Sequence, residues 1–160
     1  MNVTLRPESS ADQAFLRRLI VETVTLELGA EAWPEPMRSH LIGIQYTARL
    51  HSRRVEYPGA VSHIVQADGA DAGWAVVLTT QDEVRLVDIM VLPELRGKGI
   101  GAAAIAQICA TAADRPVRLE VNLMNSGARR LYERFGFRVT GQDDVQYLME
   151  KRLQCPNRGH

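Results

Sequence analysis

A glycine-rich loop between an apolar strand and a helix is the segment of this sequence best suited to chemistry. It reads Arg96-Gly97-Lys98-Gly99-Ile100-Gly101, and an alanine-rich helical pattern over residues 102–113 follows directly. Glycines let the backbone approach a ligand closely, and a helix start offers unpaired N–H groups and the positive end of its dipole. Arg96 and Lys98 add positive charge. The segment therefore predicts an anion site, most often used for phosphate, although an ordinary strand-to-helix turn could have the same spelling.

Two familiar phosphate-binding loops do not fit this spacing. A P-loop requires Gly-Lys-Ser/Thr at its end, whereas Gly101 is followed by Ala102 and Ala103. The dinucleotide fingerprint requires Gly-x-Gly-x-x-Gly, and here the third glycine comes one residue too early. The pattern that remains is Arg-x-x-Gly-x-Gly.

This pattern follows a strand that ends Val-Leu-Pro-Glu, and it resembles the acetyl-CoA loop of the GNAT N-acetyltransferases. Two later blocks resemble the same family. One is Leu119-Glu120-Val121 followed by Asn125, and the other is Leu-Tyr-Glu-Arg-Phe-Gly-Phe at residues 131–137. The resemblance covers residues 83–138, about a third of the chain, while residues 1–82 share only the order of elements. It implies transfer of an acetyl group from acetyl-CoA, as cosubstrate, to a primary amine.

The hydropathy pattern predicts the elements that must position these residues. Strands are expected over residues 3–5, 61–67, 72–79, 84–92, 117–122, 137–139 and 145–153, and helices from Ser9 or Ser10 to Gly29 and over residues 37–54, 102–113 and 126–134. The second helix carries an apolar stripe of Met37, Leu41, Ile44 and Ala48. The order β-α-α-β-β-β-α-β-α-β-β agrees with the resemblance. The expected fold class is therefore α+β: a mixed, mostly antiparallel central sheet, splayed in the middle and flanked by helices.

Size and composition narrow the class of protein. A chain of 160 residues is expected to form one N-acetyltransferase domain, residues 1–153, with a disordered tail over residues 154–160. Its 19 basic and 19 acidic residues balance, which argues against an electrostatic nucleic-acid binder. No apolar run approaches the roughly 18 residues of a membrane span. Two cysteines without a disulfide framework favour the cytoplasm, and no His/Cys/Asp cluster has metal-ligand spacing, so no metal is expected.

Acetyl transfer to an amine requires a base, because an alkylammonium near pKa 10.4 is almost fully protonated at neutral pH. Glu120 is the first candidate. It points away from the apolar face of strand 117–122, and burial there would raise its pKa. In those members of the similar family whose base lies five residues before the asparagine, Glu120 has the matching position. The alternative for Glu120 is a structural ion pair with Arg118 or a neighbour. Glu83 is a rival base, and its alternative is an exposed turn residue. Asp88 is either a satisfied buried carboxylate or an acceptor-site group.

Tyr132 is the candidate acid, because the resemblance places a tyrosine beside the thioester sulfur. A phenol near pKa 10 is a poor proton donor to a thiolate near 8.5, so it would act mostly as a hydrogen-bond donor to developing charge. A tyrosine that only packs beside Leu131 and Phe135 is the alternative.

The remaining cofactor contacts also come from the resemblance. Asn125 is expected to contact CoA, to cap the helix that begins at Ser126, or to do both. The backbone of Ile89, Met90 and Val91 is expected to pair with the pantetheine amides as an added strand would. Residues 96–101 would bind the pyrophosphate. We expect His40, His51 and His63 to be ordinary surface or core histidines, and Arg53-Arg54 to be a solvated helix end.

Two functions of different class remain at this point. The first is an acetyl-CoA-dependent N-acetyltransferase, and the second is a non-catalytic CoA-binding sensor or interaction module. The presence of both Glu120 and Tyr132 favours the enzyme. The acceptor can be a small molecule or a protein, and the protein can be a monomer or a homodimer.

Overall fold

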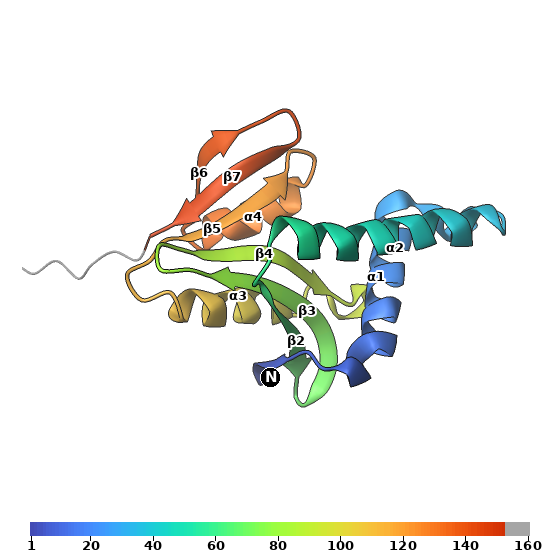
Figure 1. The fold of residues 1–160 in the computed structure, drawn as a ribbon, viewed down its shortest axis with the longest axis horizontal. Helices are drawn as coiled ribbons and strands as arrows, with labels where there is room; N and C mark the ends of the chain where they lie inside the picture. Colours follow the sequence, from blue (N-terminus) through green and yellow to red (C-terminus); the bar gives the residue numbers. More distant parts are fainter. Residues whose placement is uncertain (153–160) are drawn as a thin grey trace, which may run out of the picture.

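The computed structural model describes residues 1–152, so the last residue of the predicted domain and its predicted tail lie outside the described residues. The strands are β1 Val3–Pro7, β2 Val61–Ala67, β3 Ala70–Thr79, β4 Val84–Val91, β5 Val117–Asn122, β6 Arg138–Gln142 and β7 Gln146–Lys151. The helices are α1 Gln13–Leu28, α2 Met37–Glu56, α3 Ile100–Ala110 and α4 Ser126–Arg134, with short 3-10 turns η1 Ser10–Asp12, η2 Ala30–Ala32 and η3 Pro93–Leu95. Both the predicted order of elements and the predicted fold class are confirmed (Figure 1).

The seven strands form one sheet in the order β1-β2-β3-β4-β5-β7-β6. Every neighbouring pair is antiparallel except β4 and β5, which are parallel. Helices cover both faces. Residues of α3 and α4 share one buried cluster with the sheet, and residues of α1 and α2 share another with its opposite face. The molecule is thus three layers with the sheet in the middle.

The sheet opens between its two central strands. Strands β4 and β5 pair from Val84 with Val117 to Leu86 with Leu119, and beyond that point β7 is the one described strand that pairs with β5. In Figure 1 the β5–β7–β6 part of the sheet turns away from β4. The predicted splay is confirmed. It leaves one edge of β4, from Val87 to Val91, without a strand partner among the described residues.

A β-bulge marks the place where β4 leaves β5. Against β3, Leu86 lies opposite Val77 and Asp88 lies opposite Val76, so Val87 is an extra residue on β4. A bulge leaves its extra residue unpaired and bends the strand. The bend and the end of pairing with β5 coincide, and together they open the sheet.

Several local boundaries follow known turn and cap chemistry. Asp68 and Gly69 both have positive φ, of 50° and 80°, and close the β2–β3 hairpin as a two-residue turn, so β3 begins at Ala70 and not at residue 72. Helix α3 begins at Ile100 and ends at Ala110, earlier than the expected residues 102–113. Helix α4 and strand β5 have the predicted bounds.

The apolar stripe predicted for the second helix is not its buried face. Met37, Leu41 and Ile44 are 47%, 37% and 50% exposed. Helix α2 instead turns Ile42 toward the core, with Tyr46 and Leu50 packed beside the same cluster. The apolar spacing was helical, as expected, but the helix packs through a neighbouring face that also carries arginines.

Candidate functional site

The glycine loop has the geometry of an anion-binding helix start. Gly97 and Gly99 have φ of 78° and 83°, in the left-handed region that residues with a Cβ rarely adopt. Gly99 is the N-cap of α3, and none of the side chains in residues 1–152 caps the helix. The first hydrogen bond of the turn runs from the N–H of Ala103 to the carbonyl oxygen of Gly99, at 3.0 Å, so the three preceding N–H groups point out of the helix.

The side chains around this loop divide into exposed and buried ones. Lys98 is exposed, and so is Arg96, whose Nε donates to the Val91 carbonyl oxygen at the end of β4, at 3.2 Å. Ile100 is 2% exposed and belongs to the core, which leaves only its backbone N–H for a ligand. A Cβ on Gly101 would meet only the Val91 side chain, at an ordinary 3.7 Å. The loop therefore joins the helix start to the free edge of β4.

That free edge contains the residues predicted to pair with pantetheine. Met90 is 4% exposed, and its side chain lies in the core on the α1–α2 side. Ile89 and Val91 are half-buried against the opposite core. Their side chains are occupied by packing, so only backbone groups remain for a ligand, and an extended amide chain can hydrogen-bond such an edge as a further strand.

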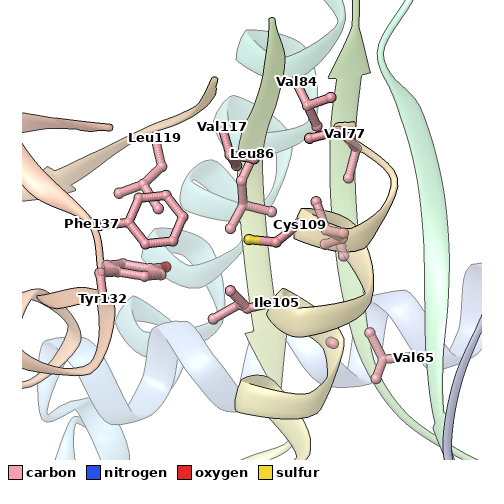
Figure 2. Packing of buried hydrophobic residues seen from close by; sticks show 14 of the residues in the cluster. Val65, Val77, Val84, Leu86, Ile105, Cys109, Val117, Leu119, Tyr132 and Phe137 are labelled. Carbon is pink, nitrogen blue, oxygen red and sulfur yellow. The ribbon is translucent and has the colours of Figure 1, made fainter. Parts of the chain in front are cut away.

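Tyr132 lies on the α3–α4 side of the opening. The ring is 8% exposed and meets Phe137 edge-on, with centroids 5.7 Å apart. In Figure 2 the side chain points from α4 toward β4, beside Phe137 and near Ile105. Burial first, and then the negative charge of Asp88, raises the pKa of Tyr132 to about 12. At neutral pH the hydroxyl is thus a firmly protonated hydrogen-bond donor.

Asn125 caps helix α4. Its Oδ1 accepts a hydrogen bond from the N–H of Ala128, at 3.1 Å, and its side chain is exposed. The capping role left open by the sequence is therefore confirmed. A contact with CoA stays a prediction, and the exposed amide nitrogen is the atom that could make it.

Glu120 lies on β5 one residue beyond the last pair with β4. The face is as predicted, because Val117, Leu119 and Val121 are buried and Glu120 points the other way. The expected burial of Glu120 is wrong: its side chain is 36% exposed. Gln146 of β7 donates to Oε2 at 2.7 Å, and Arg85 of β4 donates to Oε1 at 3.4 Å. The opening of the sheet is what leaves this carboxylate in contact with solvent.

Glu83 sits at the opposite end of β4, where the strands are paired. Its side chain is 17% exposed and receives hydrogen bonds from Arg85, at 3.1 Å, and from Arg118, at 2.9 Å. Burial by itself would raise the pKa of Glu83, but the two guanidinium groups outweigh it and hold the pKa below its usual value. A carboxylate so firmly ionised and paired is poorly suited to accept a proton.

A cluster that the sequence analysis missed surrounds Asp88, directly after the bulge. Arg49 donates two hydrogen bonds to its carboxylate, both at 3.1 Å, and Arg53 donates a third at 3.1 Å. The expectation that Arg53 is solvated is therefore wrong, whereas Arg54 is exposed. The available signal was the four-residue spacing of Arg49 and Arg53, which places both on one helix face, together with the single carboxylate of an apolar strand.

The three singled-out histidines do not join this site. His40 and His51 are exposed on α2, and His63 is half-buried in β2, where burial lowers the pKa of its imidazole. Within residues 1–152, no three His, Cys, Asp or Glu side chains are placed to share a metal ion. No described helix combines the length and the apolar character that crossing a membrane requires.

Comparison with known proteins gives a family for this fold and site. The sequence profile of the Acetyltransferase (GNAT) family matches residues 21–137. Curated relatives include a Bacillus subtilis protein provisionally named as an N-acetyltransferase of alanine in ribosomal protein bS18, 29% identical over 54% of this chain and 60% of that protein. Streptothricin acetyltransferase of Streptomyces lavendulae is 39% identical over 52% of this chain and 47% of that protein.

A solved structure shares the fold over nearly the whole chain. The PaiA N-acetyltransferase of Thermoplasma acidophilum, in complex with coenzyme A, has a TM-score of 0.69 at 21% identity, covering 96% of this chain and 100% of that one. The match to this chain spans less than two thirds of each of the two curated relatives. The chain belongs to the acetyltransferase (GNAT) family.

Proposed function

We propose that the protein transfers the acetyl group of acetyl-CoA to a primary amine, by direct attack of the amine while both substrates are bound. One observation carries the proposal. The free edge of β4 is followed, after the turn η3 and the glycine loop, by a helix start that no described side chain caps, and Tyr132 faces the same opening. A free strand edge can hydrogen-bond an extended amide chain, and an anion site that follows it can bind a pyrophosphate. The two together match a molecule with an amide chain at one end and a pyrophosphate at the other.

The residues present fit acetyl-CoA. We infer that the N–H groups of Ile100, Gly101 and Ala102 hold the pyrophosphate, with Arg96 and Lys98 supplying charge. A Cβ on Gly97 or Gly99 would have no neighbour within 4 Å in the described part of the chain, so the space beside the loop is open there. The backbone of Ile89, Met90 and Val91 would hold the pantetheine amides. Bound there, the cosubstrate supplies an activated thioester near the bulge.

Glu120 is the proposed base for the incoming amine. An ammonium must lose its proton before it can attack, and an exposed carboxylate at the opening can accept that proton directly or through one water. Gln146 and Arg85 fix the two carboxylate oxygens and still leave the group in contact with solvent. Glu83 lacks this access, because two arginines occupy it.

Tyr132 is the proposed hydrogen-bond donor to the leaving thiolate. With its pKa raised to about 12, full transfer of its proton to a thiolate near 8.5 would be uphill by about 5 kcal/mol. Its contribution is therefore a hydrogen bond that strengthens as charge develops on sulfur. The unpaired backbone at the bulge residue, Val87, is suitably placed to meet charge that develops on the carbonyl oxygen.

Two measurements test the proposal. Acetyl-CoA should raise the melting temperature, because a ligand that binds only the native state adds stability, about 2.7 kcal/mol at one hundred times its Kd. A panel of amines with acetyl-CoA should then release CoA thiol in an amine-dependent manner. Binding without release for any amine would favour the CoA-binding sensor, and no stabilisation by acetyl-CoA would overturn the cofactor assignment.

A further inference from the structure

The cluster around Asp88 contains one more arginine than its carboxylate requires. Arg49 alone makes a two-pronged pair with Asp88, through Nε and Nη2, both at 3.1 Å. Such an arrangement already satisfies the geometry and charge of a buried carboxylate. Arg53 adds only its Nε, at 3.1 Å to Oδ2. Arg49 already neutralises Asp88, so the main effect of the third hydrogen bond is to orient the guanidinium of Arg53.

Most of the Arg53 guanidinium is left to bind something else. Its two terminal nitrogens have no hydrogen-bond partner among the described residues, and its side chain is 27% exposed. The other nearby acid, Glu27, approaches Arg49 and not Arg53, at 3.8 Å, and is 54% exposed. Guanidinium N–H groups that are half-buried need acceptors from water or from a ligand.

Arg53 also lies beside the opening of the sheet. Asp88 directly follows the bulge on the free edge of β4, and its charge is close enough to raise the pKa of Tyr132, after burial. Figure 1 shows the C-terminal half of α2 lying over β4. Tyr132 approaches from the α3–α4 side, so Arg53 lines the approach from the opposite face.

We propose that Arg53 binds a carboxylate of the acceptor, so that the acceptor is a small amino acid and not a simple amine. This assignment rests on the proposed acetyl transfer at the same site. Asp88 holds the guanidinium of Arg53 by its Nε. The two terminal nitrogens of Arg53 can then donate two parallel hydrogen bonds to a planar anion such as a carboxylate. Its positive charge also favours the neutral form of an amine held nearby, which is the form that attacks.

Matched acceptors test this assignment. Glycine and β-alanine should be compared with their amides, with kcat/KM measured by release of CoA thiol. We expect the acids to be preferred by about 10- to 100-fold, the range for charge-assisted hydrogen bonds. The expected preference runs against intrinsic reactivity, because the amine of each amide is less basic and more often unprotonated at neutral pH.

Two substitutions then test whether the preference for acids over amides depends on the Arg53 side chain. Arg53→Gln should lower kcat/KM for the acids to near that for the amides and should change the amides far less, and Arg49 would still neutralise Asp88. Arg54→Gln removes the same charge from the next residue, which is exposed, and should change neither. Equal rates for acid and amide in the unmodified protein, or an equal loss for both in Arg53→Gln, would overturn the proposal.

A binding measurement separates this inference from the proposed function. N-acetylglycine should bind in the presence of CoA, by calorimetry, and Arg53→Gln should weaken that binding by about 10-fold or more. If no amine is acetylated but this binding depends on Arg53, the carboxylate site stands and the proposed reaction fails. If amines are acetylated but neither N-acetylglycine nor N-acetyl-β-alanine binds, the carboxylate site is overturned and the reaction stands.

Discussion

The two ends of the eight-residue strand β4 differ in their pairing: strands flank the first end on both sides, whereas the second end has one free edge. At its start, β4 pairs on both sides, and Glu83 and Arg85 are tied into ion pairs with Arg118 and Glu120. Past the bulge, β3 is the one strand among residues 1–152 that still pairs with β4, and the other edge of β4 is free of described strands as far as Val91. Charged residues occur at both ends. The difference teaches that here the loss of pairing, and not the presence of titratable residues, creates a place for substrates.

The largest expected effect comes from filling the open end. Gly101→Glu places a carboxylate where the pyrophosphate is proposed to bind, and stabilisation by acetyl-CoA should disappear in a thermal-shift assay. The fold should tolerate the change, because Gly101 has no positive φ and acidic residues near a helix start are favourable. Gly101→Ala is the matched control and should still bind. An unchanged shift in Gly101→Glu would move the phosphate site elsewhere.

Glu120→Gln should cost about 100-fold in kcat/KM near neutral pH. The substitution keeps the size of the side chain, and it removes only basicity from an exposed position, so stability should hardly change. The loss should shrink toward high pH, where more of the amine is already unprotonated. Rates measured from neutral to alkaline pH check this, with Glu83→Gln as the comparison. A larger kinetic loss in Glu83→Gln would reverse the assignment of the base.

Tyr132→Phe should slow the chemical step by about 10- to 100-fold, the value of one hydrogen bond to a charged group. Binding of acetyl-CoA should stay nearly the same, because the ring and its contact with Phe137 are preserved. The rate is to be measured with an acceptor for which chemistry limits turnover. Wild-type turnover in this variant would leave Tyr132 with a packing role only.

The smallest effect on catalysis should come from the closed end. Glu83→Gln should instead lower the free energy of unfolding by about 1 to 3 kcal/mol at neutral pH, since a hydrogen-bonded, largely buried charge is lost. The arginines keep the pKa of Glu83 below its usual value. Its stabilising contribution is therefore present above the usual glutamate pKa and is lost as pH falls through the lowered one.

Denaturant titrations at several pH values test that sign. The difference in stability between the wild-type protein and Glu83→Gln should be full near pH 7 and narrow as the solution becomes acidic. A difference in stability that does not change even below about pH 3, where an ordinary carboxyl group is protonated, would show that the charge of Glu83 does not stabilise the paired end of β4.

Local sequence patterns predicted correctly those elements whose caps and buried faces are set by residues close in the sequence. The bounds of α4 follow from Asn125, whose side chain caps the helix, and the buried face of β5 follows from the alternation of Val117, Leu119 and Val121. The glycine loop was recognisable because left-handed positions and a helix start have a distinctive composition. Each of these features depends on residues that are neighbours in the chain.

The errors concern partners that are distant in the chain. An apolar stripe on α2 does not show which face will meet the sheet, and Arg53 looks like a solvated helix end until Asp88, 35 residues away, is placed beside it. Glu120 was expected to be buried because a central strand normally has a neighbour on each side. The bulge at Val87 breaks that rule, and an apolar strand gives no sign of it in its sequence.

The extra residue in β4 also makes one position in the strand dispensable to the alternation of its side chains between the two cores. Leu86 packs toward α3 and α4, Val87 and Met90 pack toward α1 and α2, and Ile89 packs toward α3 and α4 again. Deleting Val87 would restore strict alternation and return every other side chain to its present face, whereas deleting Leu86, Ile89 or Met90 would exchange faces along part of the strand. A change in chain length at this point can therefore close or open the sheet while the rest of the fold keeps its sequence, so descent with insertions and deletions could gain or lose the opening in a single step.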